Sequence, residues 1–270
     1  MEEDMKKLLF FVFSVLLIFP FISSCIIAVV DFPDEAGFPE VQEFEKNVPL
    51  DAGGTLSLEN IDGDIEIQGW DRNELQVFAE KIMPNLYNRK IRMFHWNYSV
   101  PKIEFDKFED FVKIKTRAAS GESKAKTVHY EVRVPHSINL KDITAVKGDI
   151  FISDLYGEAY IELKNGDIKV DNFSGSLTAS VDNGSIKASL YDLRNEDELT
   201  ISTKQGDIIV YLQPEVNCRI EASSPDGDIF CEFDIENPMP TDKISTVIGE
   251  DGASISLTTL NGNIEIKKME

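Results

Sequence analysis

The chain has 270 residues, of which 42% are hydrophobic, so it has ample material for one large domain or two small ones. It carries 48 acidic and 27 basic residues, a formal net charge of −21. That balance argues against a sequence-independent nucleic-acid binder and against docking on anionic lipid through a basic patch. Three cysteines and three histidines are too few for a disulfide scaffold or a histidine-built metal site.

The N-terminus has the pattern of a membrane-targeting segment. Lys6 and Lys7 precede residues 8–30, which carry no charge and are numerous enough to cross a bilayer. Within them, Ile22-Ser23-Ser24-Cys25 resembles the lipobox of a bacterial lipoprotein. The resemblance implies that residues 1–24 are a signal peptide and that Cys25 is lipidated, so that membrane lipid holds the chain. The alternative is an uncleaved transmembrane anchor, and both interpretations place the remainder outside the cytoplasm.

A short spacer follows the apolar segment. It contains Pro33, Gly37, Pro39 and several acidic residues, a composition typical of a linker. We therefore expect residues 25–47 to be a tether that lifts a single domain, residues 48–268, off the membrane.

A four-residue unit, x-Gly-Asp-Ile, recurs along this domain, with Ser or Asn replacing Asp in two copies. From Asp149 onward, successive copies are 18, 18, 22, 21 and 35 residues apart. The copies lie at residues 62–65, 147–150, 165–168, 183–186, 205–208, 226–229 and 261–264. A unit repeated so regularly predicts a repeat architecture.

Each unit is flanked by residues that alternate between apolar and polar, as in Ile161-Glu162-Leu163 and Ile168-Lys169-Val170. Such alternation predicts half-buried strands, and Asn-Gly or Asp-Gly between strands predicts a tight turn. A meander of antiparallel hairpins and a parallel β-solenoid both fit. The near-constant repeat length, with Ile at the same place after each Gly, favours the solenoid. The sequence thus predicts an all-β, single-domain parallel β-solenoid, or β-helix, with little helix after residue 47.

Three stretches resemble the DUF4097 family of adhesin-like proteins. They are residues 53–72, which include Gly63-Asp64-Ile65, then Tyr130-Glu131-Val132-Arg133-Val134-Pro135, and residues 257–264. The resemblance spans about residues 48–268. It implies a β-helical domain of a bacterial cell-envelope protein and brings no catalytic motif.

Residues 82–127 are the least regular part of the domain. They contain Arg89, Lys90, Arg92 and Trp96, which would suit a basic and aromatic patch for a sugar or an anionic envelope polymer. They also contain alternating stretches such as Val112 to Ile114, so the other interpretation is a set of strands that caps the open end of the solenoid.

The aspartates of the repeated turn are the main candidate site. Asp149, Asp167, Asp207 and Asp228 would line one edge of stacked coils. Rows of carboxylates can hold Ca²⁺. The other interpretation is that each carboxylate accepts a backbone N–H within its own turn, a role that Ser185 and Asn263 could also fill.

Cys218 and Cys231 are the second candidates, and both are in phase with apolar neighbours. In an antiparallel hairpin they would lie opposite each other and could form a disulfide. In a solenoid they would lie on facing layers, about 10 Å apart, which is too far for that bond.

No histidine lies in a recognisable nucleophile, zinc or phosphate-loop motif. We therefore expect a non-catalytic surface scaffold or adhesin-like binding module, with no cofactor and an unidentified envelope or surface partner. The alternatives are a Ca²⁺-dependent adhesive module and a polysaccharide-active enzyme built on a β-helix.

Overall fold

The computed structural model describes residues 40–83, 101–118, 127–235, 241–250 and 252–269. Those residues form strands and turns and contain no helix, which confirms the all-β prediction. No helix among them is long and apolar enough to span a membrane. The predicted signal peptide, Cys25 and residues 25–39 of the predicted tether lie outside the described residues.

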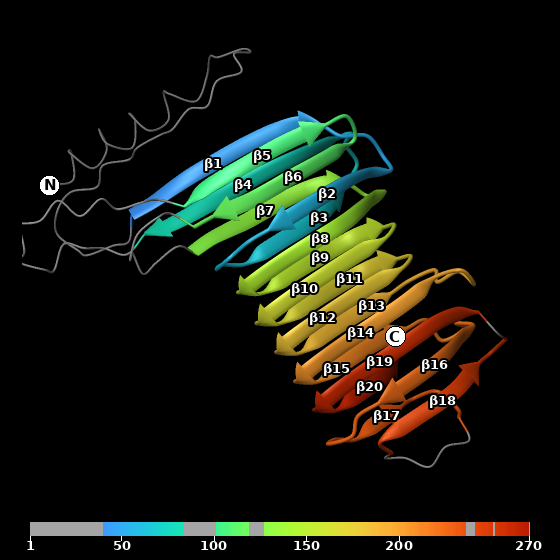
Figure 1. The fold of residues 1–270 in the computed structure, drawn as a ribbon. Coiled ribbons are helices and arrows are strands. Elements are labelled where there is room, and N and C mark those ends of the chain that lie inside the picture. Colours follow the sequence, from blue (N-terminus) through green and yellow to red (C-terminus); the bar gives the residue numbers. More distant parts are fainter. Residues whose placement is uncertain (1–39, 84–100, 119–126, 236–240, 251, 270) are drawn as a thin grey trace, which may run out of the picture.

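Within the described residues, twenty strands form two ten-stranded mixed sheets. The first sheet has the order β1-β4-β7-β3-β9-β11-β13-β15-β20-β17, and the second has the order β18-β16-β19-β14-β12-β10-β8-β2-β6-β5. In Figure 1 the strands are stacked from β1 at one end to β18 at the other. The strand bounds are β1 Glu40–Pro49, β2 Gly54–Glu59, β3 Ile65–Trp70, β4 Glu74–Met83, β5 Lys102–Phe108, β6 Phe111–Arg117, β7 Thr127–Pro135, β8 Ile138–Lys147, β9 Ile150–Tyr156, β10 Ala159–Asn165, β11 Ile168–Ser174, β12 Leu177–Asn183, β13 Ile186–Leu190, β14 Glu198–Gln205, β15 Ile208–Leu212, β16 Cys218–Ser223, β17 Ile229–Cys231, β18 Lys243–Ile248, β19 Ala253–Asn261 and β20 Ile264–Lys268.

The middle strands pair in parallel, each with the strand two places further along the chain. Ile168 pairs with Ile150 on one side and with Ile186 on the other, and Ile208 continues the row. These side chains are at most 1% exposed, and they point between the two sheets into one continuous core. The isoleucine after each turn glycine therefore sets the register of the stack, because a slip by one residue would turn the whole row outward.

The ends of the stack depart from this pattern. β1, β4 and β7 pair antiparallel at one end of the first sheet, and β5 pairs antiparallel with β6 at the edge of the second. The Lys46 ammonium lies 3.9 Å from the centroid of the Phe105 ring, so β1 and β5 meet at this end. The described part of residues 82–127 therefore supplies terminal strands. At the other end, β18 pairs antiparallel with β16.

Residues 40–47 belong to β1 rather than to a tether. They pair with β4 along their whole length, from Glu40 opposite Met83 to Asn47 opposite Gln76. The sequence hides this strand because most of its side chains are exposed, and only Phe44 and Val48 pack against the core. A terminal strand needs few apolar residues, so its composition resembled that of a linker.

Turn glycines are required where successive repeats touch. Gly166 has φ +134°, and a Cβ atom placed on it would lie 1.9 Å from the carbonyl oxygen of Gly148 in the preceding turn. Only glycine adopts this conformation easily and has no Cβ atom to clash with the neighbouring carbonyl. The backbones of the two turns are therefore in direct contact at this point.

Gly166→Ala should therefore destabilise the fold more than Gly53→Ala. Gly53 also has a positive φ, +84°, but a Cβ atom placed on it would have no other atom within 4 Å. The control should cost about 1–2 kcal/mol for the conformation alone, whereas Gly166→Ala adds the clash with Gly148. Urea unfolding of the two variants measures both costs, and equal midpoints would contradict close packing of the turns.

Candidate binding surface

The aspartates of the repeated turn form a hydrogen-bonded ladder along one edge of the stack. The Asp167 N–H donates to Asp149 Oδ1 over 2.8 Å, and the Ser185 N–H donates to Asp167 Oδ1 over 2.8 Å. The Asn263 N–H donates to Asp207 Oδ1 over 2.7 Å, and the Asp228 N–H donates to Asn263 Oδ1 over 3.0 Å. The expected acceptor role is present, but the donor belongs to the neighbouring turn and not to the same turn.

The geometry of the turn explains why a side-chain acceptor is needed there. Between two successive turns, the Gly148 and Ile150 N–H groups donate to the carbonyls of Asn165 and Asp167. The Asp167 N–H lies between these two bonds and faces the preceding turn, where the Asp149 carboxylate receives it. Ser185 fills the same place with its hydroxyl, which accepts the Asp207 N–H over 3.2 Å. Any short side chain with an oxygen can thus occupy the position.

The ladder aspartates are brought into one row, as the sequence predicted. Among the described residues, however, no group of three or more His, Cys, Asp or Glu side chains is arranged to hold a metal ion.

Cys218 and Cys231 are free thiols on different sheets, in β16 and β17. Burial raises the pKa of the Cys218 thiol to about 12 and also raises the pKa of the Cys231 thiol. Both therefore remain protonated at neutral pH, where they act as small apolar side chains of the core.

The most distinctive local feature of the second sheet is a β-bulge in β8. Leu140 and Ile143 are paired with Ala159 and Ile161 of β10, so Lys141 and Asp142 together face the single residue Tyr160. The same two residues interrupt the pairing with β2 on the other side. Asp142 has φ 55°, a left-handed conformation that costs about 1–2 kcal/mol in a residue with a Cβ. Such local strain persists where the surrounding structure enforces it, commonly at functional sites.

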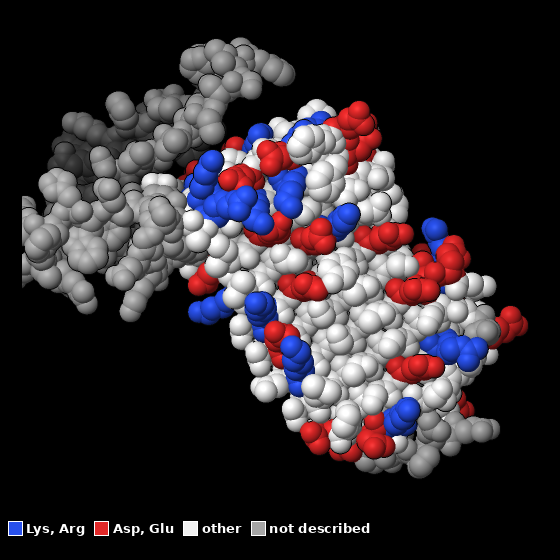
Figure 2. Space-filling model, in the orientation of Figure 1, with Lys and Arg blue, Asp and Glu red and all other residues white. Residues whose placement is uncertain are grey.

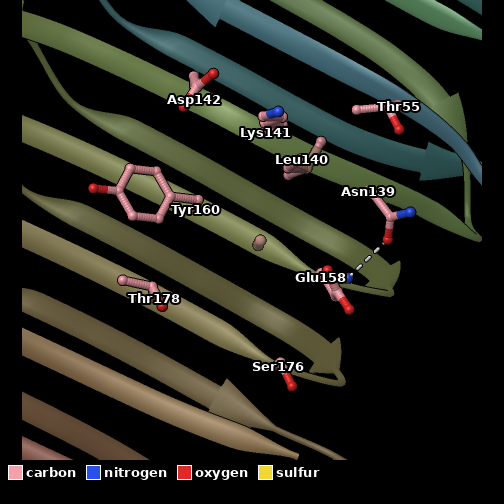
Figure 3. Close-up of a pocket in the computed structure, with 10 residues that line it drawn as sticks. Thr55, Asn139, Leu140, Lys141, Asp142, Glu158, Tyr160, Ser176 and Thr178 are labelled. Atoms are coloured by element: carbon pink, nitrogen blue, oxygen red, sulfur yellow. Dashed lines mark hydrogen bonds between the residues drawn. The ribbon is translucent and has the colours of Figure 1, made fainter.

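The bulge opens a shallow groove of about 540 Å³ on the outer face of β2, β8, β10 and β12. Figure 3 shows Tyr160 at one end, Asp142 and Lys141 above it, and Thr178 below it. At the other end, the Glu158 N–H donates to Asn139 Oδ1 over 3.1 Å. The lining residues are Thr55, Asn139, Leu140, Lys141, Asp142, Glu158, Ala159, Tyr160, Ser176 and Thr178.

Tyr160 supplies the aromatic surface of the groove. The side chain is 40% exposed, and its hydroxyl donates to Glu162. That hydrogen bond raises the pKa of the phenol, so the group stays neutral and its orientation is fixed. An exposed ring beside carboxylate, amide and hydroxyl groups suits a sugar, which presents an apolar ring face and a rim of hydroxyls.

Beyond the groove, the middle of β12, β14 and β19 carries no charged side chain on this outer face, whereas Lys164 of β10, Asp182 of β12 and Lys204 of β14 lie toward its margin. Figure 2 shows a broad area without charge on this side, with acidic and basic residues along its margins. The outward side chains of β12, β14 and β19 there include six hydroxyl groups in aligned rows, Thr178, Ser180, Thr200, Ser202, Ser256 and Thr258. This face therefore favours a neutral partner over a charged one.

A family model described as Toastrack DUF4097 matches residues 40–267. The chain belongs to the DUF4097 family. The match starts at the first residue of β1, in agreement with the strand found there. No curated protein matches the chain.

Solved structures with low identity cover most of this family member. A candidate cell adhesion protein from Clostridium sporogenes is 14% identical, with a TM-score of 0.47, over 84% of this chain and 100% of that one. A candidate adhesin from Bacteroides fragilis is 11% identical, with a TM-score of 0.31, over 84% of this chain and 97% of that one.

The groove was not predicted from the sequence, although a signal for it was present there. Ile138 and Leu140 are in phase with each other, and so are Ile143 and Ala145, but the two pairs are out of phase. One extra residue in a period-2 pattern is the mark of a β-bulge. The phase shift therefore located the bulge, while the residues that line the groove come from four strands that only the fold brings together.

Asp167→Ala should destabilise this DUF4097 domain, whereas Asp167→Asn should not. Alanine leaves the Ser185 N–H without its acceptor, at a cost of about 1 kcal/mol. Asparagine keeps the acceptor, as Asn263 does in the natural ladder. Urea unfolding distinguishes the two variants. Equal stability of Asp167→Ala and wild type would contradict the ladder, and a wild-type midpoint lowered by EDTA would favour the calcium hypothesis.

Proposed function

We propose that this protein is a membrane-anchored, extracytoplasmic, adhesin-like module that binds a neutral glycan without catalysing a reaction. The observation that carries the proposal is the groove at the β8 bulge, where Tyr160 faces Asp142 and Lys141 beside an uncharged hydroxyl surface. Membership in the DUF4097 family supports the surface role, because the resemblance to that family implies a cell-envelope protein.

The scaffold in this proposal is a β-solenoid. Parallel pairing of β8, β10, β12, β14 and β19 supports it, as does the matching row of β9, β11, β13, β15 and β20. A rigid stack of this kind presents its outer faces as extended surfaces, which suits a polymer better than a small ligand.

The anchor in this proposal is the N-terminal segment. The lipobox-like residues up to Cys25 support attachment through lipid. β1 begins at Glu40, so only about fifteen residues separate that cysteine from the folded domain. The module is then held close to the membrane surface, where envelope polymers are its nearest partners.

Tyr160→Ala should weaken binding to a neutral polysaccharide by about tenfold, because an aromatic contact of this kind contributes about 1.4 kcal/mol. The assay is binding of full-length protein to an array of glucans, mannans and galactans. Tyr156→Ala is the matched control, because Tyr156 is also an exposed tyrosine but lies on β9 of the other sheet. Equal effects of the two variants, or no binding by the wild type, would contradict the proposal.

A second variant separates binding from folding. Asp142→Gly relieves the left-handed strain while it removes the carboxylate from the groove. The melting temperature should stay the same or rise, while glycan binding falls.

A further inference from the structure

The outer face of the first sheet differs from the hydroxyl rows of the second because it carries two lysines directly side by side. Lys169 of β11 and Lys187 of β13 are direct partners in the parallel register, and both are exposed. Neither has a carboxylate within ion-pair distance in the described part of the chain. Like charges directly across two strands destabilise a sheet. In a chain with a net charge of −21, an unneutralised pair of this kind needs an explanation.

Aromatic rings hold the two ammonium groups in place. Lys169 Nζ lies 4.8 Å from the centroid of the Phe151 ring, and Lys187 Nζ lies 5.0 Å from the centroid of the Tyr211 ring. Phe151 is on β9 and Tyr211 is on β15, three strand spacings apart, or about 14 Å. The side chains therefore lean in opposite directions, which relieves their repulsion and fixes two separated positive charges.

The charges at the Tyr211 end of this pair are mixed, because Lys267 and Lys268 lie there together with Glu232 and Glu265. There, an open hollow of about 660 Å³ is lined by Tyr211, Tyr191, Lys267 and Lys268, together with Ser189, Glu232 and Met269. Lys267 Nζ is 2.5 Å from Glu265, and this hydrogen bond raises the pKa of the lysine, which stays charged. We call Phe151, Lys169, Lys187, Tyr211, Lys267 and Lys268 the lysine strip.

The geometry of the strip selects the class of its partner. Two ammonium groups that lean apart, toward rings three strand spacings from each other, do not converge on one small anion, but they match a linear polymer with repeated negative groups. The ammonium groups cover the faces of Phe151 and Tyr211, so these rings are not free to stack on the bases of a nucleic acid. The hollow at Tyr211 has the size of a typical ligand site and can receive a sugar unit.

We propose that the lysine strip binds a linear acidic polysaccharide, whose carboxylate or sulfate groups contact Lys169 and Lys187 and one of whose sugar units occupies the hollow beside Tyr211. This goes beyond the proposed function, because the strip lies on the other sheet and binds an acidic polymer instead of a neutral one. The molecule then has one face for a neutral glycan and one for an acidic glycan, and it can bridge the two polymers.

The test compares two double variants of the full-length protein. Lys169→Gln/Lys187→Gln removes two positive charges from the strip, and Lys164→Gln/Lys204→Gln removes two from the second sheet. Binding to polygalacturonate and to dextran sulfate is measured, with unmodified dextran as the neutral probe. The strip variant should bind both acidic polymers at least about tenfold more weakly, and the control variant should bind them like wild type. Added salt should weaken wild-type binding.

Several results would overturn the proposal. Equal losses in the two double variants would mean that net charge, and not the strip, attracts the polymer. Failure of wild type to bind either acidic polymer, or equally tight binding of duplex DNA, would also reject an acidic polysaccharide. The Tyr160→Ala variant should bind dextran sulfate like wild type. The proposal for the strip and the proposal for the groove are therefore tested independently.

The melting temperature of the variant distinguishes a loss of binding from a loss of folding. The Lys169→Gln/Lys187→Gln variant loses the repulsion between two like charges and also the contacts of the ammonium groups with Phe151 and Tyr211, so its melting temperature should change little. A variant that melts at a lower temperature would show that the lysines stabilise the sheet, and would contradict their assignment to binding.

Discussion

Direct backbone contact between successive turns is the constraint on which the structure depends. From Gly148 onward, each glycine of the repeated unit comes so close to the carbonyl of a neighbouring turn that no side chain fits, as at Gly166 and Gly148. The N–H groups of Gly148 and Ile150 then bond to the next turn, and the Asp149 carboxylate receives the N–H that lies between them. The repeated unit therefore stacks successive turns on one another, and its aspartate contributes one of the hydrogen bonds between them.

The outer faces of the two sheets follow from the same constraint. Because the isoleucines fix the register inside, outward residues of equal position form straight rows across the strands. Rows of threonine and serine give the middle of one sheet a neutral surface, and a row through Phe151 places Lys169 and Lys187 side by side on the other sheet. Where one extra residue enters, at Asp142 in β8, the rows break and a groove forms. Recognition thus depends on the outward-facing side chains of the repeats, while stability depends on their buried side chains.

Spacing predicted the centre of the molecule better than its ends. The 18-residue interval between Asp149 and Asp167 placed Ile150 beside Ile168, because stacked repeats of equal length bring equal positions together. At the ends, capping strands within residues 82–127 were one of two interpretations, whereas β1 and β18 escaped prediction, since they have few buried residues and follow no repeat. The groove also escaped it, because net charge and motifs describe the chain as a whole, whereas Tyr160, Asp142 and Asn139 meet only through the pairing of β8 with β10.

Amide hydrogen exchange measured by NMR tests the stacking of turns most directly. The amides of Asp167, Ser185 and Asn263 should be strongly protected, although all three lie in exposed turns, because each donates to a side chain of the neighbouring turn. Exchange should accelerate at Ser185 in Asp167→Ala and remain slow in Asp167→Asn. Exchange of these amides at the rate of an unstructured chain would contradict the contact between turns from which the rest of the fold follows.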